Sequence, residues 1–242
     1  MPDITFTAGA ESLRGYQAVP DGDGGPWPGV VVLHEVFGLN EDIRRQADRF
    51  AAAGYVAIAP DLYTGGPRLR CVRRAFRDLL SRRGRTWEAI EATRAWLASA
   101  AECTGRVGVI GFCMGGGFAL VAAAKYDFAA ASVNYGVVPR KAERVLTGAC
   151  PIVASYGGRD LTLRRATGRL ESALDALDVP HDVKEYPDVG HGFLGQHEPT
   201  RPIVALSRIT MSYGYDAVAA EDAWTRILDF FAEHLRATAP AP

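Results

Sequence analysis

Five short, largely apolar runs recur along the chain, and stretches with helical spacing of apolar residues separate them. The runs occupy residues 29–33, 55–59, 107–110, 131–135 and 152–156. A strand that is apolar along its whole length is buried on both faces, which is typical of a parallel sheet covered by helices. The helices expected around these strands are 41–53, 71–83, 87–100, 114–125, 163–177 and 217–236. The sequence therefore predicts an α/β fold, with one domain over residues 1–242, a mostly parallel central sheet and helices on both faces.

Local signals indicate where some of these elements begin and end. Asn40 is a good N-cap for the helix that follows it, and Gly54 ends that helix. Thr86 is expected to open the helix that contains Trp87. The segment 20–28 is rich in Pro and Gly, and we expect it to form a hairpin-like loop between two strands.

The composition excludes several classes of partner. The 242 residues carry 27 Lys and Arg against 28 Asp and Glu, so nothing indicates a nucleic acid or an anionic membrane as a partner. The first residues lack a basic segment followed by an apolar one, and no apolar run approaches the ~18 residues of a membrane span. We expect a cytoplasmic protein that is a monomer or a weak homodimer.

The four cysteines are scattered. None belongs to a C-x-x-C pair, and no histidine lies near one at a spacing typical of zinc sites. We therefore expect free thiols in a reducing compartment, no metal and no organic cofactor.

One of these cysteines, Cys113, lies in the sequence Gly-Phe-Cys-Met-Gly-Gly of residues 111–116, directly after an apolar run and directly before a helical stretch. A strand, a glycine-flanked turn and a helix form the context of a nucleophile elbow, in which a Cβ two residues to either side would collide with the turn or the helix. The alternative is that Cys113 is a small buried apolar residue, as most free cysteines are.

A thiol that attacks a substrate needs a base nearby, because near neutral pH it is mostly protonated. His191 is the candidate, in a glycine-bracketed loop after the expected strand 181–186, and His34 is its rival. The orienting acid should lie between nucleophile and histidine in the chain, and Asp160 follows the run 152–156. The alternatives are that Asp160 caps a helix starting near Leu161 and that His191 is an ordinary loop histidine.

A basic series occupies the helix and loop before the elbow: Arg68, Arg70, Arg73, Arg74, Arg77, Arg82, Arg83 and Arg85. A solvated helix face explains such a series by default. The competing interpretation is that one of them binds a carboxylate of a ligand.

Several motifs together resemble the dienelactone hydrolase family of the α/β-hydrolases, over nearly the whole chain. They are His34–Asn40, Ala59–Tyr63, Gly111–Gly116, Asp160 and Gly190–Phe193. The resemblance implies that Glu35 lies beside the sulfur of Cys113 and takes its proton when substrate arrives. It also implies an oxyanion hole formed by the backbone N–H groups of Val36 and Met114.

The enzyme that names the family binds a substrate carboxylate with an arginine shortly after the catalytic histidine, where this chain has Phe193 and Gly195. Its second arginine precedes the elbow, which makes Arg73, Arg74 and Arg77 candidates for substrate binding, together with Phe193.

The expected activity is hydrolysis of small carboxylic esters or lactones through a thioester on Cys113. A thiolate leaves a tetrahedral intermediate more readily than an alkoxide does, so we expect enol, aryl or thio leaving groups. The alternatives are a general esterase or peptidase on the same fold, and a catalytically idle member that senses or binds a ligand.

Overall fold

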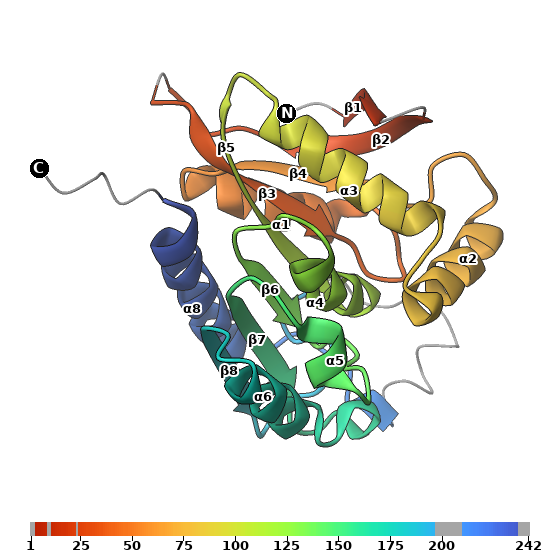
Figure 1. The fold of residues 1–242 in the computed structure, drawn as a ribbon, viewed down its shortest axis with the longest axis vertical. Coiled ribbons are helices and arrows are strands. Elements are labelled where there is room, and N and C mark those ends of the chain that lie inside the picture. Colours follow the sequence, from red (N-terminus) through yellow and green to blue (C-terminus); the bar gives the residue numbers. More distant parts are fainter. Residues whose placement is uncertain (1–2, 9–10, 23, 197–209, 237–242) are drawn as a thin grey trace, which may run out of the picture.

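The computed structural model describes residues 3–8, 11–22, 24–196 and 210–236, and these build one eight-stranded sheet (Figure 1). In spatial order the strands are β1 (Asp3–Ala8), β2 (Glu11–Ala18), β4 (Val56–Pro60), β3 (Trp27–Leu33), β5 (Cys103–Phe112), β6 (Ala131–Asn134), β7 (Ile152–Gly157) and β8 (His181–Tyr186). Strand β2 pairs antiparallel with both of its neighbours, and the other pairs are parallel. The mostly parallel sheet predicted from the sequence is confirmed.

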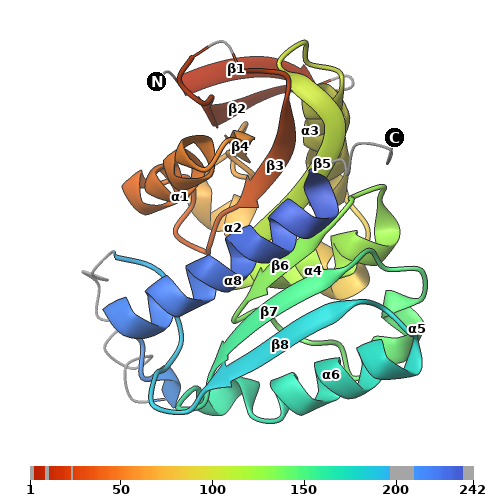
Figure 2. The same cartoon turned by 90° about the vertical axis from the view of Figure 1, so that its left-hand side faces the viewer.

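Helices cover both faces of the sheet, as Figure 2 shows. One face carries α1 (Glu41–Ala52) and α8 (Ala217–Leu235). The other carries α2 (Arg68–Ser81), α3 (Arg85–Ala98), α4 (Met114–Lys125), α5 (Ala142–Leu146) and α6 (Ala166–Ala176).

Alternation along the central strands sends side chains into two separate cores. On β3, Val30 and Val32 pack with α1 and α8, whereas Val31 and Leu33 pack with the helices of the opposite face. All four are fully buried. Successive side chains of a strand point to opposite faces, so a strand buried on both sides has to be apolar throughout.

The helix ends agree with some of the local signals. The Asn40 side chain accepts a hydrogen bond from the backbone N–H of Ile43. Helix α1 ends at Ala52, one residue before the predicted end at Ala53, and Gly54 follows. Helix α3 begins at Arg85, one residue before the predicted Thr86, and Thr86 donates from its backbone N–H and its hydroxyl to the buried carboxylate of Asp78.

The structure corrects three predictions. The segment 20–28 is not a hairpin, because β4 lies between β2 and β3 in the sheet. Helix α6 begins at Ala166 instead of residue 163, because Leu161–Leu163 forms the separate 3₁₀ turn η1. Helix α2 begins at Arg68, ahead of the predicted residue 71. The prediction also lacked β1, β2 and α5.

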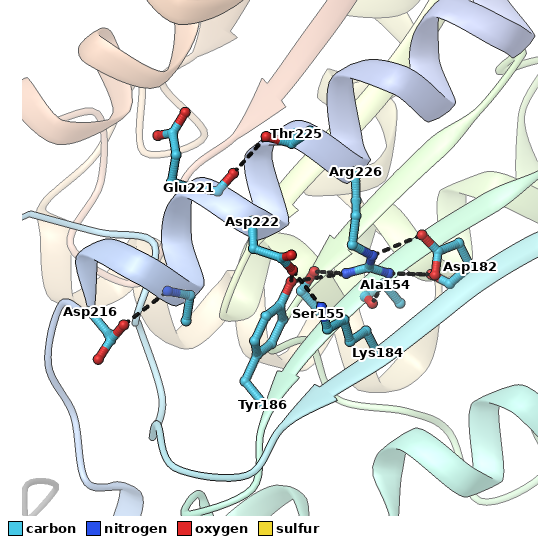
Figure 3. A network of polar contacts seen from close by, with 11 residues as sticks. Ala154, Ser155, Asp182, Lys184, Tyr186, Asp216, Glu221, Asp222, Thr225 and Arg226 are labelled. Atoms are coloured by element: carbon cyan, nitrogen blue, oxygen red, sulfur yellow. Dashed lines mark hydrogen bonds and ion pairs between the residues drawn. The ribbon is translucent and has the colours of Figure 1, made fainter.

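Helix α8 is tied to the sheet through Arg226 (Figure 3). Its guanidinium group donates to the Ser155 hydroxyl and the Ala154 carbonyl oxygen on β7, and to the Asp182 carboxylate and carbonyl on β8. It also donates to the Tyr186 hydroxyl, which in turn donates to Asp222 of α8 at 2.6 Å. One side chain thus links α8 to two adjacent strands. None of the helices in the part of the chain that the structure describes is both long and apolar enough to cross a membrane.

Candidate active site

Cys113 lies between the end of β5 and the start of α4, in a backbone conformation that residues other than glycine rarely adopt. Its φ is 54° and its ψ is −114°, a strain of about 1–3 kcal/mol that the surroundings have to sustain. A Cβ on Gly111 would lie 2.0 Å from the carbonyl oxygen of Gly115, and a Cβ on Gly115 would lie 2.2 Å from that of Leu33. The two glycines therefore allow the helix to approach the strand ends as closely as the turn requires.

Asp160 and His191 form a buried pair at the ends of β7 and β8. The Oδ2 atom of Asp160 lies 2.6 Å from Nδ1 of His191, and its Oδ1 atom accepts hydrogen bonds from the backbone N–H and the hydroxyl of Thr162. The carboxylate thus caps η1 and orients the histidine at the same time. Burial alone would raise the pKa of Asp160, but the hydrogen bonds from His191 and Thr162 outweigh it and lower the pKa.

The second nitrogen of the His191 ring, Nε2, is buried and has no hydrogen bond of ordinary geometry within the described residues. Burial would lower the pKa of His191, but the charge of Cys113 and the bond to Asp160 raise it to about 10. The imidazole therefore favours its protonated form.

Close backbone contacts hold the two loops that carry this pair. A Cβ on Gly157 would lie 2.3 Å from the carbonyl oxygen of Gly190, so the end of β7 and the histidine loop touch directly. The N–H of His191 donates to the Met211 carbonyl oxygen at 2.7 Å, and the His191 carbonyl accepts from Gly214 at 3.2 Å. These contacts fix the imidazole relative to Asp160.

His34, the rival histidine, is fully buried and both ring nitrogens have backbone partners. Nδ1 lies 2.7 Å from the Glu35 carbonyl oxygen, and Nε2 accepts from the N–H of Leu62 at 3.1 Å. These contacts require the neutral ring with its proton on Nδ1, and burial lowers the pKa of His34 accordingly. His34 connects two loops and has no nitrogen available for proton transfer.

Glu35 is 2% exposed, and two tyrosines hold its carboxylate. The Tyr135 hydroxyl donates to Oε1 at 3.3 Å, and the Tyr213 hydroxyl donates to Oε2 at 3.1 Å. Both tyrosine rings also flank the imidazole of His191, at centroid distances of 4.9 and 5.9 Å. Burial, the charge of Glu35 and the nearby charge of Cys113 all raise the pKa of both phenols. Glu35, Cys113 and His191 thus meet around two tyrosines that the sequence analysis missed.

The two expected oxyanion-hole residues meet at Tyr63. Its hydroxyl donates to the Val36 carbonyl oxygen at 3.1 Å and lies 3.9 Å from the Met114 sulfur. Met114 is the first residue of α4, where backbone N–H groups have no acceptor within the helix. The loop after β3 and the start of α4 therefore lie side by side at the carboxyl edge of the sheet.

The four expected substrate-binding residues have other surroundings. Arg74 donates to the Leu62 carbonyl oxygen at 3.4 Å, Arg77 pairs with its neighbour Asp78, and Arg73 is exposed on α2. Phe193 is fully buried, with its ring between those of Tyr135 and Tyr186, so it offers no surface to a substrate. Arg68, at the start of α2, reaches the loop after β3, where it donates to the Phe37 carbonyl oxygen at 2.6 Å.

In the α/β-hydrolases a reactive side chain stands on a glycine-flanked turn after a central parallel strand, and an acid and a histidine follow on later strands. The order of Cys113, Asp160 and His191, which follow β5, β7 and β8 respectively, places this chain in that class. The comparison with family models is more specific. Residues 13–235 match the model of the dienelactone hydrolase family, and the chain belongs to that family.

Similar proteins cover almost the whole chain. A Yersinia pestis protein named carboxymethylenebutenolidase is 28% identical over 99% of this chain and 91% of its own length. A Synechocystis protein of the same name is 31% identical, and the alignment covers 93% of each chain. A crystal structure from Klebsiella pneumoniae, described as a dienelactone hydrolase, has a TM-score of 0.77 at 25% identity and covers 96% of this chain and 98% of its own. The protein is a carboxylic ester hydrolase.

Proposed function

We propose that this enzyme hydrolyses small esters and lactones with enol, aryl or thio leaving groups, through a thioester on Cys113. The observation that supports this most directly is the strained turn of Cys113 beside the buried Asp160–His191 pair. In this proposal the sulfur attacks as a thiolate, which is its nucleophilic form, and His191, whose pKa is raised to about 10, holds a proton for the leaving group.

In the proposed acylation, the Cys113 sulfur attacks the carbonyl carbon and the carbonyl π electrons move to its oxygen. The N–H groups of Val36 and Met114 stabilise this oxyanion. When the tetrahedral intermediate collapses, the bond to the leaving group breaks and His191 donates the proton that the leaving group takes.

In the proposed deacylation, His191 removes a proton from water as the water oxygen attacks the thioester carbon. Collapse of this second intermediate releases the carboxylic acid and returns the Cys113 thiolate. Asp160 keeps the imidazole oriented in both steps, and Glu35 is the acceptor for the thiol proton when Cys113 is protonated before substrate arrives.

The sulfur limits the choice of substrate. An intermediate expels its better leaving group, and a thiolate with an ordinary pKa of ~8.5 leaves far more easily than an alkoxide. Simple alkyl esters therefore mostly return to starting material, whereas enolates, phenolates and thiolates compete with the enzyme sulfur.

The test is a rapid-mixing experiment with p-nitrophenyl acetate. We expect a burst of one nitrophenolate per active site and an acetyl adduct on Cys113 in the mass spectrum. Cys150 is a matched control, because burial raises its pKa to about 12 and makes it a poor nucleophile. Cys150→Ala should keep the burst and Cys113→Ala should lose it with an unchanged circular dichroism spectrum. Turnover by Cys113→Ala would refute the mechanism, and a wild-type protein that binds but never turns over would favour a ligand sensor.

A further inference from the structure

A cavity of about 620 Å³ lies beside α4. Helix α4 is on the same face of the sheet as α2 and α5 (Figure 1). The apolar lining of the cavity comes from the end of α2, from α4, from the segment between β6 and α5 and from α5 itself: Leu79, Leu80, Val121, Val137, Val138 and Val145. We call this cavity the basic groove, because cations surround its apolar lining.

Two of the apolar side chains in the basic groove are exposed to solvent. Leu80 is 80% exposed and Val137 is 49% exposed. Large aliphatic side chains that are exposed together in a concave site lose contact with water when an apolar ligand covers them. The lining therefore favours a ligand with an apolar portion.

Four cations belong to the same lining: Arg82, Arg140, Lys141 and Arg144. Among the described residues none of the four forms an ion pair, and no acidic residue lines the groove. Glu143 is the acidic side chain nearest in sequence, and it lines a neighbouring depression with Arg169. Arg140, Lys141 and Arg144 border both that depression and the basic groove. The positive charge around the apolar lining is complementary to an anion.

The basic groove is adjacent to the candidate active site but separate from it. Gly117 lines the groove, and its N–H donates to the Cys113 carbonyl oxygen at 3.1 Å, one helical turn from the cysteine. Val137 follows Tyr135, whose ring contacts His191, by two residues. Neither Cys113 nor His191 lines the groove.

We propose that the basic groove is an accessory binding site for a small amphiphilic anion, a single alkyl chain that carries a carboxylate. Its volume falls within the 300–1,000 Å³ or so of small-molecule sites, which favours such a ligand over a folded partner. The chain lies on the valine and leucine side chains, and the carboxylate lies among the arginines and Lys141. This site does not depend on the hydrolysis proposed above.

The test is isothermal titration of the whole protein with decanoate, below its micelle concentration, and with decanol as the uncharged chain of equal length. We expect one saturable decanoate site per chain and weaker binding of decanol. The double variant Arg140→Gln, Arg144→Gln should weaken decanoate binding about tenfold, as loss of two surface charge contacts implies, and leave decanol unchanged. Val137→Ser should weaken both ligands.

Arg83→Gln is the matched control, since Arg83 is also exposed but does not line the groove. It should bind decanoate like the wild type, and all these variants should hydrolyse p-nitrophenyl acetate at the wild-type rate. Several outcomes would overturn the proposal: no saturable binding, decanol binding as tight as decanoate, an unchanged double variant, or loss of binding after alkylation of Cys113. The last would place decanoate in the active site, and binding only to anionic vesicles would indicate a membrane surface.

Discussion

Asp160 has two structural roles that substitution can separate. One carboxylate oxygen orients His191 and the other caps η1. Asp160→Asn keeps an oxygen for the cap but places a neutral amide against the imidazole. Asp160→Ala removes both contacts. We expect Asp160→Asn to lose activity with little loss of stability, and Asp160→Ala to lose both.

The expected loss of activity follows from the buried 2.6 Å hydrogen bond between Asp160 and His191. A hydrogen bond to a charged group contributes about 1.5–3 kcal/mol, so its loss should lower the pKa of His191 by about one to two units. Loss of the correct tautomer adds to this, and we expect kcat to fall about 10²–10⁴-fold in Asp160→Asn. The lost cap should cost Asp160→Ala a further ~0.5–2 kcal/mol of unfolding free energy.

The assay combines the pH profile of p-nitrophenyl acetate hydrolysis with urea unfolding of both variants. In Asp160→Asn, the loss of activity at high pH should begin at a lower pH, because His191 deprotonates earlier. The reasoning is refuted if Asp160→Asn keeps most of its activity, or if it is as unstable as Asp160→Ala.

Three further predictions concern Cys113, Glu35 and the substrate. The pKa of His191 is raised from 6.5 to about 10, so its protonated form stabilises the fold fully below pH 6.5, and this contribution is lost as the pH rises towards 10. NMR titration should show a lower His191 pKa in Cys113→Ala than in the wild type. An equal pKa would contradict the influence of Cys113 on the imidazole. Glu35→Gln should slow acylation and iodoacetamide labelling in the presence of a substrate analogue, with Tyr213→Phe giving a smaller change; a loss of thermal stability alone would make Glu35 structural. Across acetate esters, acylation should quicken as the pKa of the leaving group falls, and a neutral aryl ester should react at least as fast as its carboxylated counterpart; a strong preference for the carboxylate, removed by replacing Arg73, Arg74 or Arg77, would show that α2 binds an anion.

Much of the fold could be predicted from the sequence because buried parallel strands have a strong local signal. The runs at β3 and β5 are apolar on both faces, and they are too short for a typical helix, which favours strands. Strands β1 and β2 were missed because they are half-polar and depend on pairing at the sheet edge, where β2 meets the distant β4. Such pairing is a tertiary effect that a local pattern does not contain.

Some residues of the candidate active site could be predicted from local patterns, and others could not. Strand ends and glycines predicted where Cys113, Asp160 and His191 lie in the chain. The surroundings of His34 could not be predicted, because the N–H group that binds its Nε2 atom belongs to Leu62 on another loop. Tyr213 approaches Glu35 across 178 residues of sequence, and no motif around Tyr213 indicates that approach.

The link through Arg226 also bears on how the protein matures during synthesis. Arg226 joins partners that are 44 and 71 residues earlier in the chain, and Trp224 and Phe231 of α8 cover one core of the sheet. A nascent chain that ends before α8 already contains Cys113, Asp160 and His191, but nothing yet fastens β7 to β8 from that side. Long-range contacts of this kind form late in folding. We expect the enzyme to become active only after α8 has left the ribosome, so a truncated product should be inert towards esters although its reactive cysteine is present.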